Sequence, residues 1–518
     1  MRARPTSRVL RTLIALGTIA ALGACDRTVQ PTEVLPALEV SNVDADAGSW
    51  RPIVLASPEQ VPVPAPLAVT SAEYRAELEA VVRAQRTMTP AQRANMEYWS
   101  SGGVLRWNQV MRELVARYNL PPAPRADGTY VFPDADNPFA DPNFPFANPP
   151  YAARAYAYVS VAQYDALKAA WFWKYRHNRP APSRTNATIS TRVAATTLPS
   201  YPSEDAVLSA VSAEMLRLLF PASVEQITRL AADQRDAALL SGRATASDIA
   251  AGVALGRAVA AAVIARAGAD GMRNAVGNAS LWASLADSVR ARGETPWTSL
   301  ESPARPPMLP LFGRVAAWTM TPAQLLADGP PPPPSTNSAQ FRDELAEVRR
   351  TVDGLTRAQY AIALKWNDGA GTYTPPGHWN DIAAEPVRDA RMSEVRAART
   401  FAWLNMAMHD AAVACWGVKY QYFNPRPSQV DRAIRTPIGL PNFPAYPSGH
   451  STFSAAAATV LGHLFPARAT EFAQMADEAG ISRLYGGIHY RSDITEGKAH
   501  GTRIGAIVVR AAQTDGAR

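Results

Sequence analysis

The chain has 518 residues, of which 47% are hydrophobic and 19% charged. This length is enough for two to four domains or one large helical assembly with a sizeable core. The formal charge is +7, but the first 25 residues hold four arginines, which leaves 48 basic and 45 acidic residues, a net charge of +3. Because no run of lysine or arginine occurs, nucleic acid is excluded as a partner.

The first 25 residues have the layout of an export signal. Four arginines precede an uncharged apolar run from Thr12 to Ala24, which is typical of a signal peptide. The ending Leu22-Gly23-Ala24-Cys25 resembles a bacterial lipobox, and an ordinary secretory signal is the alternative. We therefore expect an exported protein of the cell envelope or periplasm, held at a membrane by a lipid on Cys25. Cys415 would then be the only other cysteine, so no internal disulfide can form.

Helical patterns dominate the remainder of the chain, and two Pro-rich stretches interrupt them. Ser71 and Thr89 precede amphipathic segments as N-cap residues do. Long strand-like alternation is nearly absent, so the predicted class is all-α. The expected organisation is a signal peptide, a flexible Pro-rich tether, an N-terminal helical bundle, a Pro-rich linker and a C-terminal helical bundle, with bounds 1–25, 26–70, 71–327, 328–340 and 341–518.

An internal repeat relates the two predicted bundles. Residues 201–221 read YPSEDAVLSAVSAEMLRLLFP and residues 446–466 read YPSGHSTFSAAAATVLGHLFP, an interval of 245 residues. The same interval relates Asp165 to Asp410, Trp171 to Trp416 and Lys174 to Lys419. Generic likeness between Ala-rich helices would not place these residue types in one register. We interpret the repeat as two packed helical bundles of the same design.

The positions at which the copies differ carry the chemical signal. At the 245-residue interval, Gly449 corresponds to Glu204 and His450 to Asp205, while Arg483 and His489 correspond to alanines. The C-terminal copy therefore holds cationic and imidazole side chains that the N-terminal copy lacks. This difference predicts a single active site, in the C-terminal bundle, and no anion site in the N-terminal copy.

These residues form the elements of an oxyanion site. Lys419, Arg426 and Arg483 supply three positive charges, two of them on planar guanidinium groups that suit a tetrahedral oxyanion. Ser448 is a good N-cap, and the N–H groups from Gly449 onward would point at a bound anion. A carboxylate such as Glu204 at this place would repel one.

Two histidines complete the set. His489 and Asp493 are four residues apart, so one helical turn lets the carboxylate orient the imidazole. His450 is then available for proton transfer. Each pattern alone is weak, because a lone charge is usually solvated and Ser-Gly at a helix start is usually only a cap. These residues lie in three segments, 419–427, 447–450 and 482–493. The occurrence of all three segments, in this order and in one copy of the repeat, is a strong signal.

The segments resemble the signature of the superfamily that joins type 2 phosphatidic acid phosphatases, bacterial acid phosphatases and vanadium-dependent haloperoxidases. That signature is Lys-x6-Arg-Pro, then Pro-Ser-Gly-His, then Ser-Arg-x5-His-x3-Asp. The fixed positions matched here are Lys419, Arg426, Pro427, Pro447, Ser448, Gly449, His450, Ser482, Arg483, His489 and Asp493.

The resemblance implies a role for each residue. The oxygens of phosphate or vanadate would be held by Lys419, Arg426, Ser448, Gly449 and Arg483. In a phosphatase, which needs no cofactor, His489 would be the nucleophile that forms a phosphohistidine and His450 would protonate the leaving group. In a haloperoxidase, His489 would be the single protein ligand to the vanadium of vanadate, and His450 would assist peroxide binding and proton transfer.

The two-bundle length resembles the haloperoxidases, since the small acid phosphatases use one bundle. Phe443 and Trp416 resemble aromatic pocket residues of fungal chloroperoxidases, although both also fit helix packing. Pro425 stands where haloperoxidases often have tryptophan, so the halide stays open. Asp368, in the Gly/Pro-rich segment 367–379, is expected at the pocket mouth as a partner for one of the arginines.

The leading hypothesis is a vanadate-dependent haloperoxidase that uses hydrogen peroxide and a halide. The second hypothesis is a periplasmic phosphomonoesterase that uses the same site on a phosphate ester. A third, an oxyanion-binding protein without turnover, is disfavoured because a binder does not need both His450 and His489.

Overall fold

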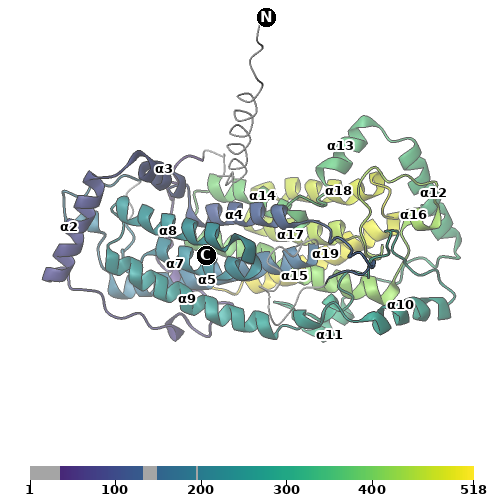
Figure 1. Cartoon of the computed structure of the whole chain (residues 1–518), viewed down its shortest axis with the longest axis horizontal. Helices are drawn as coiled ribbons and strands as arrows, with labels where there is room; N and C mark the ends of the chain where they lie inside the picture. Colours follow the sequence, from purple (N-terminus) through teal and green to yellow (C-terminus); the bar gives the residue numbers. More distant parts are fainter. Residues whose placement is uncertain (1–34, 132–148, 194–196, 518) are drawn as a thin grey trace, which may run out of the picture. The chain divides into compact units, whose positions relative to one another are not determined.

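The computed structural model describes residues 35–131, 149–193 and 197–517, and over these residues it contains helices and no strand (Figure 1). The predicted all-α class is confirmed. The leader and its Cys25 lie outside the described residues, so the expected export signal and lipid anchor stay predictions.

The helices follow one another with short connections. The α-helices are α2 (Ala72–Arg86), α3 (Pro90–Trp99), α4 (Gly103–Tyr118), α5 (Pro149–His177), α6 (Pro182–Thr185), α7 (Glu204–Leu219), α8 (Val224–Leu240), α9 (Ala246–Ala269), α10 (Ala279–Ala291), α11 (Pro322–Ala327), α12 (Ala339–Asp353), α13 (Arg357–Lys365), α14 (Thr374–Asp389), α15 (Glu394–Tyr422), α16 (Pro427–Val430), α17 (Gly449–Leu464), α18 (Ala469–Tyr485) and α19 (Arg491–Ala512). The 3-10 helices are η1 (Ala47–Ser49), η2 (Pro58–Gln60), η3 (Pro221–Ser223), η4 (Met272–Asn274), η5 (Phe312–Arg314) and η6 (Pro466–Arg468).

Helix starts are set by local side chains. Ser71 accepts a hydrogen bond from the third residue of α2, and Thr89 forms a capping box with Gln92 at the start of α3, so both predicted N-caps are confirmed. Ser203 and Ser448 cap α7 and α17 in the same way. These caps satisfy backbone donors that would otherwise have no partner in the first turn.

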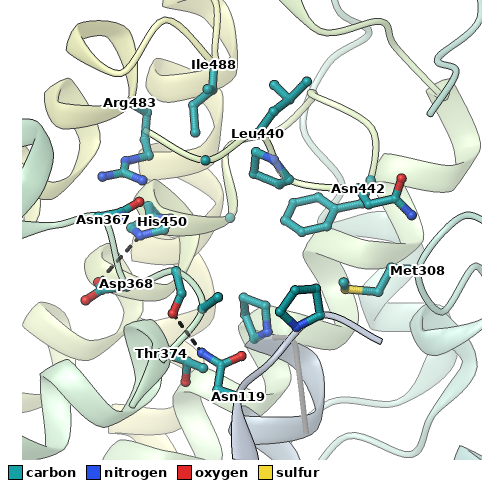
Figure 2. A pocket seen from close by; sticks show the side chains of 18 of the residues that line it. Asn119, Met308, Asn367, Asp368, Thr374, Leu440, Asn442, His450, Arg483 and Ile488 are labelled. Atoms are coloured by element: carbon teal, nitrogen blue, oxygen red, sulfur yellow. Dashed lines mark hydrogen bonds and ion pairs between the residues drawn. The ribbon is translucent and has the colours of Figure 1, made fainter. Parts of the chain in front are cut away.

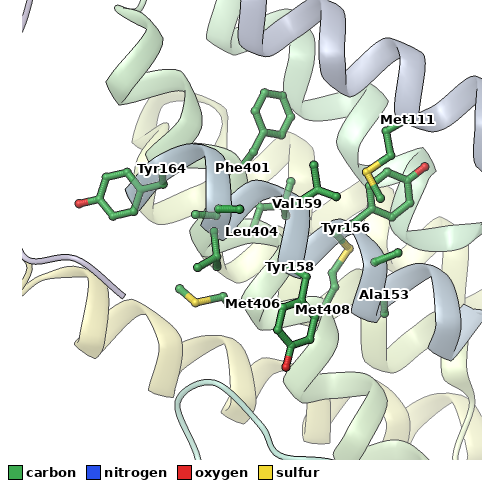
Figure 3. Close-up of a cluster of buried hydrophobic side chains, with 14 of the residues drawn as sticks. Met111, Ala153, Tyr156, Tyr158, Val159, Tyr164, Phe401, Leu404, Met406 and Met408 are labelled. Carbon is green, nitrogen blue, oxygen red and sulfur yellow. The ribbon is translucent and has the colours of Figure 1, made fainter. Parts of the chain in front are cut away.

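The two longest helices, α5 and α15, pack against each other and form the centre of the core (Figure 3). Tyr156 and Val159 of α5 lie close to Leu404 and Met408 of α15, and Met111 of α4 adds to the same cluster. Both helices are buried on nearly all sides, because other helices enclose them.

The 245-residue interval recurs in the helix boundaries. It separates both ends of α5 from those of α15, of α7 from α17 and of α8 from α18, and the start of α9 from that of α19. At the α5–α15 contact, Asn405 Nδ2 donates to Ser160 Oγ at 2.8 Å, and these two residues are themselves 245 positions apart. Contact between corresponding positions is what a two-fold relation between similar units produces. The boundaries of the two bundles at residues 71–327 and 341–518 stay predictions.

The segment from residue 36 to residue 70 packs on the helices. Trp50 is 1% exposed, and the Asp165 carboxylate of α5 accepts hydrogen bonds from the backbone N–H groups of Ile53 and Val54 at 2.8 and 2.7 Å. Asp44 binds Arg396 of α15. The flexible tether expected over residues 26–70 is therefore wrong for its described part, because apolar and charged residues scattered among the prolines have specific partners on α5 and α15.

One described stretch, Ala246–Asn274, is long and apolar enough to cross a membrane by length and composition, with a mean hydropathy of 1.7. This stretch contains α9, and its best window is 39% buried within the protein. Core helices of soluble proteins meet the same criterion, so the stretch is weak evidence for a membrane span.

Candidate active site

Lys419 lies in the last turn of α15, with its side chain fully buried. Its ammonium group donates to the carbonyl oxygens of Pro444, Ala445 and Pro447, and these three bonds use all of its N–H groups. Burial lowers the pKa of Lys419 to about 7. In this structure the residue supplies positive charge beside the site and has no N–H group free for an oxyanion.

Arg426 follows α15 and begins α16, and its guanidinium is 1% exposed. Its Nε donates to Phe443 O at 2.9 Å and its Nη1 donates to Ile488 O at 2.9 Å and to His489 Nε2 at 3.0 Å. Its Nη2 is buried without a hydrogen-bond partner among the described residues. An unpartnered buried donor is costly, so this group is ready to bind a ligand acceptor.

Arg483 comes from the last turn of α18 and is also 1% exposed. Its Nε donates to Ser482 Oγ at 2.9 Å and its Nη2 donates to the carbonyl of Trp366. Burial lowers the pKa of Arg426 and of Arg483 to about 10 each. Carbonyl and hydroxyl acceptors orient both guanidinium groups but do not neutralise them.

No carboxylate among the described residues forms an ion pair with Lys419, Arg426 or Arg483, whereas ion pairs are common elsewhere in the chain. Buried charges are expensive unless an opposite charge accompanies them. The charges of Asp493 and Asp368 raise the pKa of these groups, but neither carboxylate forms a direct ion pair with them, so the three buried cations favour an anion from solution.

The start of α17 brings backbone donors to the same place. Ser448 caps the helix through its side chain, and its own N–H donates to Asp493 O at 2.9 Å, which ties α17 to the start of α19. A Cβ on Gly449 would meet only the rings of Phe453 and Trp416, at 3.5 and 3.8 Å. Since the protein's own packing does not demand glycine, the missing side chain leaves room for a ligand at a helix N-terminus.

The hydrogen bonds of His489 define its tautomer. Nδ1 lies 2.8 Å from Asp493 Oδ2, and Nε2 lies 3.0 Å from Arg426 Nη1. A guanidinium can only donate, so Nε2 carries the lone pair and Nδ1 carries the proton that goes to Asp493. Burial, followed by the charge of Arg426, lowers the pKa of His489 well below its usual value. The residue is a neutral imidazole whose Nε2 can act as a nucleophile or a ligand.

Asp493 begins α19 and accepts a second hydrogen bond, from Tyr490 N at 3.1 Å. Burial raises the pKa of this carboxyl group. The single carboxyl group thus caps α19 and orients the imidazole of His489, which is the pairing that the four-residue spacing predicts.

His450, the second residue of α17, faces a different carboxylate. Its Nε2 lies 3.5 Å from Asp368 Oδ2 (Figure 2). The other oxygen of Asp368 lies 3.0 Å from His378 Nδ1. Burial, followed by the charge of Arg483, lowers the pKa of His450 to about 4. Asp368 forms no direct ion pair with an arginine, because both of its carboxylate oxygens face histidines, but its charge acts on Arg483 and raises the pKa of that guanidinium.

These groups border a cavity of about 420 Å³. Arg483, His450 and Asp368 lie along one side in Figure 2, with Met308 and Asn442 on the opposite side. Four more of the residues predicted from sequence line the wall. Lys419, Arg426 and Ser448 do not line it but are buried next to residues that do. Those four lining residues are Trp416, Phe443, Gly449 and His489.

Two aromatic rings border the cationic cluster. Trp416 and Phe443 have ring centroids 5.0 Å apart, and Lys419 Nζ lies 5.8 and 5.3 Å from these centroids. Trp416 Nε1 donates to Met308 O at 3.2 Å, so the ring has a structural anchor as well as a place in the wall. Trp416 and Phe443 therefore line the cavity and also contribute to packing, as both interpretations of the sequence expected.

Sequence reasoning gave no role to His378, Met308 or Asn442. His378 lies ten residues from Asp368 on α14, and Met308 precedes η5, far from any motif. The one available signal was that His378 and Asp368 occupy the same Gly/Pro-rich segment. His409 and His500 are fully buried away from the motif segments.

The residues present fit a tetrahedral oxyanion. The fit rests on the unpartnered Nη2 of Arg426, the lone pair on His489 Nε2, and the space left by Gly449. Among the described residues, no group of three or more His, Cys, Asp or Glu side chains could hold a bare metal ion. A tetrahedral oxyanion needs no such group, because cationic side chains and backbone N–H groups bind its oxygens.

Comparison with known proteins agrees with this geometry. A family model described as the PAP2 superfamily matches residues 401–517. The chain is 25% identical to the first bacterial vanadium-dependent iodoperoxidase with a crystal structure, over 70% of this chain and 91% of that one, with a TM-score of 0.54.

A holo-type bacterial vanadium-dependent chloroperoxidase is 14% identical, over 74% of this chain and 96% of that one, with a TM-score of 0.50, which speaks for the fold alone. No curated protein sequence matches the chain. Residues 401–517 thus match the PAP2 superfamily, and the all-α fold is similar to that of the bacterial vanadium-dependent iodoperoxidase.

Proposed function

We propose that the protein is a vanadate-dependent haloperoxidase that oxidises a halide with hydrogen peroxide. The observation that carries this proposal is the likeness to the bacterial iodoperoxidase over 70% of the chain, which extends well beyond the 401–517 match. The buried cations without ion-pair partners and the lone pair on Nε2 of His489, beside Arg426, support the same proposal, since they suit an oxyanion cofactor.

The overall reaction balances simply. Hydrogen peroxide, a halide ion and one proton give hypohalous acid and water; the O–O bond breaks, and the halide is oxidised by two electrons. Bound vanadate would supply the Lewis acidity that activates the peroxide. His489 would hold the vanadium through Nε2, while Arg426, Arg483 and the N–H groups at the start of α17 would hold the oxygens.

His450 would move the proton. Above a pH of about 4 its imidazole is neutral, because burial and the charge of Arg483 lower its pKa. A bound oxyanion adds negative charge nearby, which favours the imidazolium. Binding of the anion would therefore bring a proton to His450, where the reaction consumes it.

A phosphomonoesterase is the second candidate, and the contact between His450 and Asp368 favours it. In this reaction Nε2 of His489 attacks phosphorus, the bond from phosphorus to the ester oxygen breaks, and His450 protonates the leaving alkoxide. Water then cleaves the phosphohistidine and releases phosphate. An imidazole held by a buried carboxylate is the usual arrangement for such acid catalysis.

A paired assay tests the proposal. The purified protein would be incubated with vanadate, peroxide and iodide, bromide or chloride in the presence of a dye that is halogenated, and separately with an aryl phosphate. We expect dye halogenation that requires vanadate. Release of phosphate that vanadate blocks, without halogenation by any halide, would contradict the proposal and favour the phosphatase.

We also propose that the protein is exported and held in the cell envelope by a lipid on Cys25. The support is the sequence of the leader alone. Mass spectrometry of the protein isolated from its native membrane would test it, and a mature N-terminus at any residue other than Cys25 would contradict the lipid anchor.

A further inference from the structure

Asp368 lies between two histidines near the cavity. Its Oδ1 is 3.0 Å from His378 Nδ1 and its Oδ2 is 3.5 Å from His450 Nε2. The carboxylate side chain is 5% exposed, and its backbone has a positive φ of 47°, which few non-glycine residues adopt. Asp368 Oδ2 and His450 Nε2 are both buried, and at 3.5 Å neither has a hydrogen-bond partner among the described residues, so His378 is the one hydrogen-bond donor to this carboxylate there. The orientation of this carboxylate therefore depends on His378.

His378 is itself held firmly in place. Its ring stacks on Trp366 with centroids 4.4 Å apart and an interplanar angle of 27°. Trp366 Nε1 donates to Glu478 at 2.8 Å, and the Trp366 carbonyl accepts from Arg483. The stacked pair thus joins α14 to the end of α13 and to one of the oxyanion-binding arginines.

We propose that His378 is a positioning residue for the reaction at this site: its Nδ1 donates to Asp368 and holds the carboxylate with Oδ2 facing Nε2 of His450, where the two atoms can form a hydrogen bond when a ligand is bound. The proposal rests on the proposed function in that His450 transfers protons, and it holds equally for the phosphatase alternative. His378 does not line the cavity, so it acts through its neighbours, and its hydrogen bond to the site is the one to Asp368.

The charge state of Asp368 agrees with this role. Burial raises the pKa of the carboxyl group, but the contacts with His378 and His450 outweigh burial and lower the pKa overall. The ionised carboxylate only accepts hydrogen bonds, so it selects the Nε2–H tautomer of neutral His450. The lone pair of that imidazole is then on Nδ1. Without the bond from His378, the carboxylate would turn and His450 would lose its fixed tautomer and orientation.

Two substitutions at one position separate the hydrogen bond from the ring stack. His378→Phe keeps a ring on Trp366 but removes the donor, whereas His378→Asn removes the ring but can place its Nδ2 donor near the original Nδ1. We expect His378→Phe to lower kcat by about 10- to 100-fold with KM nearly unchanged, as loss of a supporting hydrogen bond commonly does. His378→Asn should recover most of this loss, although it packs less well. Thermal unfolding of both variants would report the packing effect separately.

A second readout does not depend on activity. In protein labelled with ¹⁵N-histidine, the shifts of the His450 ring nitrogens report which one carries the proton, and a His450→Gln spectrum assigns them. We expect a protonated Nε2 in the wild type and in His378→Asn, and mixed tautomers in His378→Phe. This experiment remains decisive if the protein proves to be neither a haloperoxidase nor a phosphatase.

Two results would overturn the proposal. One is a His378→Phe variant that keeps the wild-type kcat and the Nε2–H tautomer. The other is an equal loss of kcat in the Phe and Asn variants, because the donor would then be irrelevant.

Discussion

Two corresponding lysines, one in each half of the chain, have different charge partners. Lys174 near the end of α5 and Lys419 near the end of α15 are fully buried, and each donates to a proline carbonyl, at 2.6 and 2.9 Å. Lys174 is also 2.7 Å from the carboxylate of Glu204. Gly449 stands at the position that corresponds to Glu204, so Lys419 has no such partner.

The other charges follow the same pattern. In the N-terminal half, Arg243 pairs with Asp205 and Arg179 pairs with Asp248. Asp493, which corresponds to Asp248, instead orients His489. At these positions the N-terminal half pairs its buried cations with carboxylates, whereas Lys419, Arg426 and Arg483 of the C-terminal half have no ion-pair partner among the described residues. The comparison teaches that an anion site in this fold arises where internal carboxylates are absent.

The largest expected effect comes from His489→Ala, which introduces the alanine that occupies the corresponding place in the N-terminal half. Removal of the only Nε2 lone pair aimed at the oxyanion should lower kcat by at least ~10³-fold, for either chemistry. Steady-state kinetics would measure the loss. His463→Ala, outside the cavity wall, is the matched control, and an active His489→Ala enzyme would refute the site.

Gly449→Glu would transfer the internal carboxylate to the C-terminal half. The space around Gly449 admits a side chain, and the new carboxylate should neutralise Lys419 and compete with the anion. We expect vanadate affinity to fall at least ~100-fold, which corresponds to about 3 kcal/mol. Isothermal titration would measure it, with Gly449→Ala as the control for bulk alone. Unchanged vanadate affinity in the glutamate variant would contradict the claim that an internal carboxylate at this position removes the anion site.

The reciprocal change, Glu204→Gln, should affect stability and not activity. It leaves Lys174 buried without a carboxylate, and loss of one partner of a buried ion pair costs about 3–5 kcal/mol. Urea unfolding would show the loss, and Glu225→Gln, at an exposed surface position, should change stability by less than about 0.5 kcal/mol. A variant as stable as the wild type would mean that Glu204 does not compensate Lys174.

A smaller effect concerns pH and the carboxylates near Asp205. Glu394, at the start of α15, accepts hydrogen bonds from Gly103 N and Val104 N; burial, with a contribution from Asp205, raises its pKa to about 7 from 4.5. Between these values the folded state binds more protons than the unfolded state, so stability should fall as pH rises from 4.5 to 7, by at most ~3 kcal/mol.

Denaturant unfolding over this pH range would measure the slope, and Glu394→Gln should flatten it. A slope that is the same in the variant and the wild type would assign the pH dependence to other groups.

The sequence by itself determined the helical class, the caps at Ser71 and Thr89, and the residues that gather at the cavity. Helix periods and caps are local, because they depend on residues three or four positions apart. The pairing of His489 with Asp493 was predictable for the same reason. The 245-residue register was visible because matched residue types recur in one order.

Only the tertiary structure decided which distant groups meet. It placed Glu204 on Lys174 as a neutralising partner, used every N–H of Lys419 on backbone carbonyls, and turned Asp368 toward two histidines. It also packed residues 36–70 on α5 and α15. These contacts join segments far apart along the chain, and side-chain chemistry alone does not specify which of several compatible partners lies within reach. The spacing of residues in the motifs therefore identified the side chains of the site. The tertiary path of the chain decided which of the charged side chains have no ion-pair partner.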